Sequence, residues 1–186
     1  STGGVFGRFD GGVAGWKLNK QVKLQAYAGS PVYSRAAKPF ADGRLMYGAS
    51  IDYTFPNDEL STSLYIMEQD IKKIVDRRAI GMDVRYANNR MFAYASADYD
   101  IFYKQLNLAY VSATWNYSLG NSVYATADFR RVPFLLTSNA LMGQSVERLQ
   151  SLAEIFGEDE IDQLALDRTA TARTLSVGTS RTLNDN

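Results

Sequence analysis

Apolar and polar residues alternate one by one along most of this chain, from Val5 to Val132. The clearest stretch runs from Leu45 to Phe55, where every second residue is apolar and the residues between them are small or polar. Successive side chains of a β-strand point to opposite faces, so this period predicts strands with one apolar face and one polar face. Helical spacing is absent from this region.

The alternation predicts eight consecutive strands, at 5–18, 22–30, 44–55, 60–70, 78–87, 91–102, 106–117 and 122–131. A ninth is expected within 168–183, where Leu175 and Val177 alternate with Ser and Gly. These segments are longer than the roughly 5–6 residues usual in soluble sheets and suit a tilted strand that crosses a bilayer. The parity breaks at Gly11-Gly12, which predicts a β-bulge there.

The predicted connections differ in length from one end of the strands to the other. Short turns rich in Asn, Gly and Pro fall at 19–21, 56–59, 88–90 and 119–121. The intervening connections are mostly longer, at 31–43, 71–77 and 133–168. An up-and-down barrel with tight turns on one rim and larger loops on the other has this organisation.

The segment after Val132 changes to helical spacing. Apolar residues recur at helical intervals from Ser145 to Phe156, Gly157 is a natural stop, and a second short helix begins at Glu158. We therefore expect a helical loop insertion near 144–166, serving as a lid, a plug, a partner contact or a packed cap. The expected organisation is an eight-strand region over 1–132, the insertion over 133–168, and a ninth strand with a turn over 169–186.

The predicted fold class is all-β, an up-and-down antiparallel transmembrane β-barrel. No run approaches the roughly 18 apolar residues of a transmembrane helix, which excludes a helical membrane protein. Bacterial single-chain barrels usually have an even number of strands, so nine or ten strands predict membership of a larger barrel.

The composition excludes several function classes. The chain has no Cys and no His, which removes thiolate or histidine metal sites and Ser-His-Asp or Cys-His nucleophiles. Twenty basic residues balance twenty acidic ones, so a nucleic-acid partner is not expected. We expect a protein that is not an enzyme and has no cofactor and no metal. An outer-membrane hydrolase is the weakest alternative.

Two sets of side chains carry the functional hypothesis. Charged residues on the polar parity are expected to line a lumen and to pair across strands; they are Asp52, Asp83, Arg85, Asp98, Asp100, Asp128 and Arg130. Aromatic residues on the apolar parity, close to the short turns, are expected to form a belt at the membrane interface; they are Trp16, Tyr53, Phe55, Tyr86, Trp115 and Tyr117.

Two charged groups have alternative readings. Asp98 and Asp100 share a face and could act as a general acid and base, although a lumen network is favoured. Lys72, Lys73 and the Arg77-Arg78 pair form a basic loop that could meet an anionic lipid or a cargo, although a solvated loop is favoured.

Several stretches together carry a family resemblance: Gly29-Ser30-Pro31-Val32, Asp76-Arg77-Arg78-Ala79-Ile80-Gly81, Asp98-Tyr99-Asp100 and 130–141. With the helical stretch and Asp167-Arg168-Thr169-Ala170, they resemble the C-terminal outer-membrane β-barrel regions of large Gram-negative envelope proteins, which often carry tetratricopeptide-type repeats before the barrel. The resemblance implies an envelope pore or anchor in the cell outer membrane, exporting polysaccharide or protein. The implied partners are outer-membrane lipid, periplasmic repeat domains and other envelope components.

A soluble β-barrel or β-sandwich that binds a ligand or partner is the alternative. It would place the same apolar faces inward. The two hypotheses therefore differ in which face of the strands is exposed.

Overall fold

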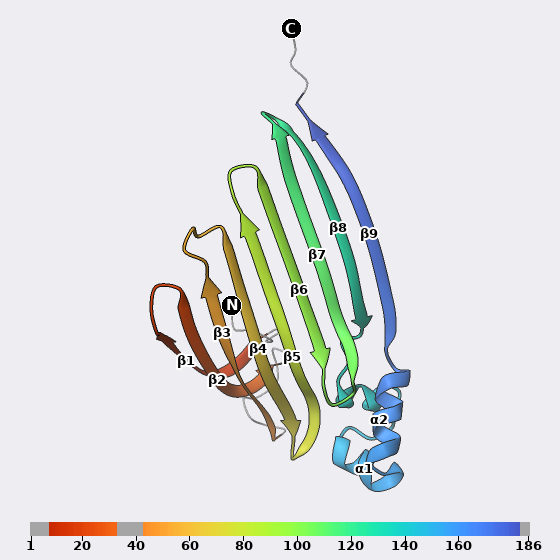
Figure 1. Cartoon of the computed structure of the whole chain (residues 1–186). Helices are drawn as coiled ribbons and strands as arrows, with labels where there is room; N and C mark the ends of the chain where they lie inside the picture. Colours follow the sequence, from red (N-terminus) through yellow and green to blue (C-terminus); the bar gives the residue numbers. More distant parts are fainter. Residues whose placement is uncertain (1–7, 33–42, 183–186) are drawn as a thin grey trace.

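The computed structural model describes residues 8–32 and 43–182, which form one antiparallel sheet of nine strands in sequence order. Each strand pairs with its neighbours in the chain, as Figure 1 shows. The strands are β1 (Arg8–Lys17), β2 (Val22–Val32), β3 (Arg44–Thr54), β4 (Leu60–Ile71), β5 (Ile74–Ala87), β6 (Met91–Asp100), β7 (Gln105–Ser118), β8 (Asn121–Val132) and β9 (Ala170–Arg181). The predicted all-β, up-and-down architecture is confirmed.

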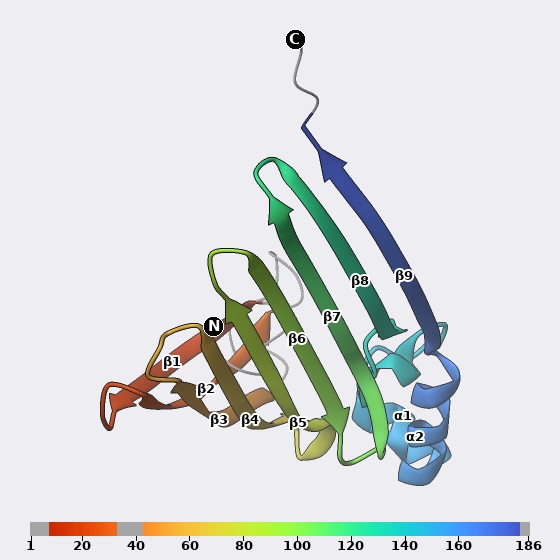
Figure 2. The same ribbon diagram turned by 45° about the horizontal axis from the view of Figure 1, so that its top comes forward.

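Among the described strands, β1 pairs only with β2, and β9 pairs only with β8. The described sheet therefore has two unpaired edges. Its first two strands run at a steep angle to β8 and β9, so the sheet is strongly twisted (Figures 1 and 2).

The connection between β4 and β5 differs from the prediction. A charged loop was expected over 71–77, but the strands continue to Ile71 and restart at Ile74, which leaves a turn of only Lys72 and Lys73. Both lysines have positive φ, of 49° and 78°, as in the two-residue hairpin turns that match the twist of paired strands. The predicted basic loop is wrong, since Arg77 and Arg78 belong to β5.

The bulge predicted at Gly11-Gly12 is also wrong, because β1 pairs with β2 without interruption from Arg8 to Lys17. Gly11 lies opposite Gly29, and a Cβ atom on Gly11 would come within 2.5 Å of the Gly29 Cα atom. The glycine here permits a close approach of two strands rather than an extra residue.

The sheet has one apolar face and one largely polar face. On the first, large apolar side chains are exposed, including Ile51 at 42%, Ile66 at 54% and Val111 at 52%. The opposite parity carries the predicted lumen residues together with the buried cluster of Tyr27, Met46, Tyr65, Met67 and Ala79. We call these two sides of the sheet the apolar face and the polar face.

The long connection between β8 and β9 contains three helices, and they lie at the end of the sheet opposite the β1–β2, β3–β4, β5–β6 and β7–β8 turns, which we call the short-turn end (Figure 1). They are the 3-10 helix η1 (Thr137–Leu141), α1 (Leu149–Phe156) and α2 (Glu158–Asp167). The predicted helical insertion is present, although α1 begins at Leu149 rather than Ser145, and Gly157 ends it with φ of 89°. No helix in the described part of the chain is long and apolar enough to span a membrane.

The insertion has a small apolar core of its own. Leu149 and Leu152 of α1 and Ile161 and Ala165 of α2 are buried together with Ile71 at the end of β4. Most of the predicted amphipathic stripe is therefore covered, although Phe156 is 49% exposed, and the covered part packs the insertion against the sheet.

Candidate functional site

The seven charged residues predicted from alternation all lie on the polar face. Cross-strand pairing joins Asp52, Asp83 and Asp128 in one row, through Ser63, Ser96 and Tyr110. Arg85 lies on the same face, two residues after Asp83. Asp98 lies opposite Leu108 in the strand register, and Leu108 lies opposite Arg130.

The predicted salt-bridge ladder between strands is only partly present. Asp128 pairs with Arg130 of the same strand. Asp52 instead accepts a hydrogen bond from Gln25 Nε2 at 2.7 Å, and Asp83 accepts one from Tyr94 Oη at 2.8 Å. Neutral side chains thus donate hydrogen bonds to two of the carboxylates.

The most buried part of the polar face is an ion pair between Arg77 of β5 and Asp98 of β6. Asp98 is 0% exposed and Arg77 is 4% exposed. Tyr65 Oη donates a second hydrogen bond to Asp98 Oδ2 at 2.6 Å, and the ring of Phe134 lies 4.7 Å from the Arg77 guanidinium. Cation, carboxylate, phenol and aromatic ring form one connected cluster.

Asp100 closes the adjacent turn. Its Oδ1 accepts hydrogen bonds from the backbone N–H groups of Phe102 and Tyr103, both at 2.9 Å. Asp98 and Asp100 are both fully buried and bonded within the fold. This arrangement is typical of structural carboxylates rather than of an accessible acid–base pair.

Two irregular residues attach the polar face to the segment 134–141. Pairing shifts register between β4 and β5, leaving Asp76 without a cross-strand partner, and Asp76 Oδ1 accepts a hydrogen bond from Ser138 N at 2.7 Å. A second register shift involves Asn107, whose Oδ1 accepts a hydrogen bond from Leu135 N at 3.3 Å. Bulges often re-aim side chains in this way.

The same segment contacts the helices. The hydroxyls of Thr137 and Tyr103 are hydrogen bonded at 2.6 Å, and Tyr103 Oη also donates to Asp162 Oδ1 of α2 at 3.2 Å. Burial raises the pKa of Tyr103. Burial also raises the pKa of Asp162, against the hydrogen bond from Tyr103, which lowers it. The insertion is therefore bonded to both the polar face and the β6–β7 turn.

Sequence reasoning missed Arg77, Asp76 and Asn107 as members of this site. Arg77 was placed in a solvated loop because charge dominates 70–78, and the bulges that bury Asp76 and Asn107 carry no glycine signal. One signal was available, because three of the stretches that carried the family resemblance meet in this cluster. They are Asp76-Arg77, Asp98-Tyr99-Asp100 and 130–141.

The predicted aromatic belt lies on the apolar face near the short turns. Trp16 and Trp115 are each 55% exposed, and Phe55 and Tyr117 are also exposed. Tyr53 and Tyr86 are half-buried, and Tyr53 packs edge-on against Phe55 at 4.8 Å between ring centroids.

No group of three or more carboxylates suited to a metal ion occurs in the described ranges 8–32 and 43–182. Comparison of the chain with protein-family models, with curated proteins and with solved structures finds no match.

Proposed function

We propose that this chain is an outer-membrane β-barrel segment that serves as an envelope pore or anchor, with its apolar face against lipid and its polar face toward the interior. One observation carries this proposal. Large apolar side chains are exposed on one face of the sheet, whereas Asp98, Arg77 and Asp100 are buried on the other. A barrel in lipid needs this distribution, which is the reverse of that in a soluble β-protein.

The strand lengths support the same proposal. The strands have 10 to 14 residues. An 11-residue strand such as β3, at ~3.4 Å per residue and tilted by about 40°, rises about 28 Å. The apolar band of an outer-membrane barrel is roughly 25 Å tall, so one strand suffices to cross it.

The polar groups of the apolar face also fit a membrane boundary. Glu68 and Arg78 form an ion pair there, and Tyr47 Oη donates to Glu68 at 2.7 Å. This patch lies toward the insertion end, opposite the Trp16 and Trp115 end. A tyrosine with charged neighbours is typical of the interface with the headgroups.

The proposed mechanism is passive. Closed backbone pairing satisfies every N–H and C=O group in lipid, so the two edges of the described sheet, β1 and β9, would have to be paired there, with each other, with further strands or with another chain. The short turns would face the periplasm and the insertion the exterior. The segment 134–141, which is bonded to the polar face through Asp76 and Asn107, would narrow the interior at that end.

The soluble alternative would bury the apolar face in a core. Against it, Leu175 and Val177 of β9 are 78% and 70% exposed, and the insertion packs on residues of the polar side. A soluble module would therefore need a separate partner to cover nearly the whole apolar face.

The test is to express the chain behind a signal peptide, fractionate the cells, and run membrane material on a gel with and without boiling. We expect outer-membrane material that migrates differently after boiling, as a closed barrel does. A soluble monomer that needs no detergent would contradict the proposal.

A further inference from the structure

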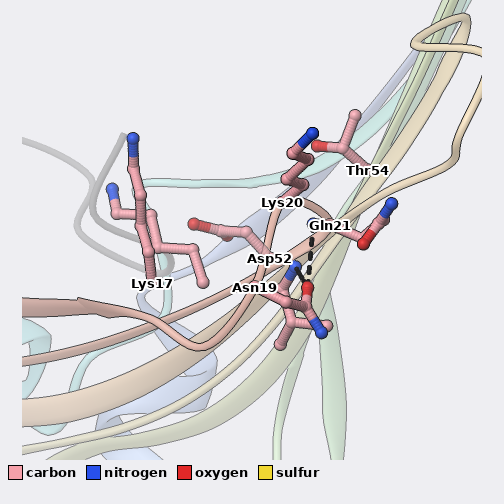
Figure 3. A pocket seen from close by; sticks show the side chains of 8 residues that line it. Lys17, Asn19, Lys20, Gln21, Asp52 and Thr54 are labelled. Carbon is pink, nitrogen blue, oxygen red and sulfur yellow. Dashed lines mark hydrogen bonds between the residues drawn. The ribbon is translucent and has the colours of Figure 1, made fainter.

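A basic hollow lies at the short-turn end of the polar face, beside the β1–β2 turn (Figure 3). Its volume is ≈ 710 Å³. Three of its eight lining residues are lysines, Lys17, Lys20 and Lys23, and one is an acid, Asp52.

The positive charges of these lysines lie close enough to repel one another. Lys17 of β1 and Lys23 of β2 are direct cross-strand partners, an arrangement that is unfavourable for like charges. Lys20 lies in the turn between them. Within the described residues, none of the three forms an ion pair.

The one carboxylate in the hollow, Asp52, lies directly opposite Lys23 across β2 and β3 and offsets only one of the three positive charges. Asp52 accepts its hydrogen bond from the neutral amide of Gln25, and it is the only acid among the lining residues of this hollow. In Figure 3 the Asp52 side chain points into the hollow, and Lys17 and Lys20 are drawn on either side of it.

A second hollow adjoins the first on the polar face and adds one acid and one base, which leaves the net charge unchanged. This hollow of ≈ 300 Å³ shares Lys23, Asp52 and Thr54 with the first and adds Asp83 and Arg85. The Arg85 guanidinium lies over the Phe92 ring at 5.8 Å, and Asp83 is bonded to Tyr94. Across both hollows, Lys17, Lys20, Lys23 and Arg85 exceed Asp52 and Asp83 by two positive charges.

The turn that carries Lys20 is fixed by its own hydrogen bonds. Asn19 Oδ1 accepts from Gln21 N at 2.8 Å and from Val22 N at 2.7 Å. The backbone of Lys20 is therefore held beside the hollow before a ligand binds, which lowers the ordering cost of binding.

We propose that this hollow binds a soluble oligoanion with closely spaced negative groups, such as a linear polyphosphate, at the short-turn mouth of the polar face. Ammonium groups act as point charges toward phosphate, and three of them can approach one such anion from different directions. The ligand is a solute rather than a lipid headgroup, because the lysine pair Lys17 and Lys23 lies on the polar face. This inference rests on the proposed function for its biological setting and names the solute class that the interior admits.

The test uses the full chain folded in detergent and inorganic tripolyphosphate, with binding measured by calorimetry at low and high salt. The double variant Lys17→Gln/Lys23→Gln should weaken binding by about tenfold at low salt. The effect should be smaller at high salt, because salt screens the Coulombic attraction between each lysine and the anion. The matched control is Lys72→Gln/Lys73→Gln, which removes two lysines from the turn at the other end of the sheet and should leave binding unchanged.

Conductance of the same preparations separates this inference from the proposed function. Binding that depends on Lys17 and Lys23 supports the site even if no conductance is recorded. Absence of conductance would then count against the pore proposal and not against the site. If pores form but tripolyphosphate binds equally to both double variants, or does not bind the unmodified chain, the site is refuted.

Discussion

The phenol ring of Tyr65 lies directly over the backbone of Gly81, its cross-strand partner on the polar face. A Cβ atom at position 81 would come within 2.2 Å of the Tyr65 ring and within 2.6 Å of the Ala97 carbonyl oxygen. The same pairing recurs where Tyr27 faces Gly48 and where Tyr124 faces Gly178. A glycine opposite each tyrosine lets the ring lie flat along the sheet.

Gly81→Ala should therefore destabilise the folded protein. The clash involves backbone as well as a side chain, so we expect a cost at or above the ~1–3 kcal/mol of an overpacked core. Urea unfolding of detergent-folded protein measures it. Gly12→Ala is the matched control, because a Cβ there meets nothing within 4 Å and should change stability little. Equal stability of the two variants would refute the packing argument.

Arg77→Ala should have a large effect because it leaves Asp98 buried without its cation. Removing one partner of a buried pair costs roughly 3–5 kcal/mol. The control is Arg130→Ala, which breaks an ion pair whose arginine side chain is 49% exposed and should cost about 0–1 kcal/mol. Urea unfolding compares the two variants. A similar loss of unfolding free energy in both would show that the buried Arg77–Asp98 pair stabilises the fold no more than the exposed pair does.

The strand order and most strand boundaries could be predicted from the sequence because each strand has unlike faces. Alternation fixes which residues share a face, so Asp52, Asp83 and Asp128 were correctly grouped on one side. Alternation also placed Trp16 and Trp115 together on the apolar face, where both are exposed. Gly157 ended α1 as expected, since its positive φ suits a helix terminus.

The centre of the candidate site could not be predicted in the same way. Asp76 and Asn107 depart from alternation because they lie at register shifts, and these depend on pairing between strands. The Lys72-Lys73 turn lacks the usual Asn or Gly, so charge suggested a loop and concealed that Arg77 is a buried strand residue.

Ile51→Asp should prevent membrane assembly, whereas Asp52→Asn should be tolerated. A carboxylate within the apolar band costs roughly 2–3 kcal/mol. Asn at position 52 can still accept the hydrogen bond from Gln25. Heat-dependent migration on a gel reports assembly of each variant. Equal tolerance of the two adjacent substitutions would refute the assignment of faces.

Docking of α2 should strengthen as the pH falls. Burial, with Asp159 and Glu158 nearby, raises the pKa of Asp162 above its ordinary value. The docked state therefore binds a proton more tightly than the undocked state. Burying the ionised Asp162 carboxylate therefore costs docking free energy. This cost is fully present above the raised pKa and disappears as the pH falls below the ordinary Asp value of about 3.9.

Hydrogen exchange of residues 149–167 across this acidic range measures the effect, with protection expected to increase on acidification. Asp162→Asn removes the titrating group and can still accept from Tyr103, so it should flatten this pH dependence and increase protection at neutral pH. Unchanged pH dependence in that variant would place the titrating group elsewhere.

The chain has two tryptophans, Trp16 and Trp115, and both belong to the proposed interfacial belt. Their fluorescence in bilayers containing brominated lipids tests most directly whether the apolar face meets lipid, with Trp16→Phe and Trp115→Phe separating the two signals. We predict that each tryptophan is quenched strongly by bromine near the headgroup, less by bromine near the chain ends, and only weakly by aqueous iodide. Full quenching by iodide with no effect of either brominated lipid would contradict a membrane-facing apolar surface.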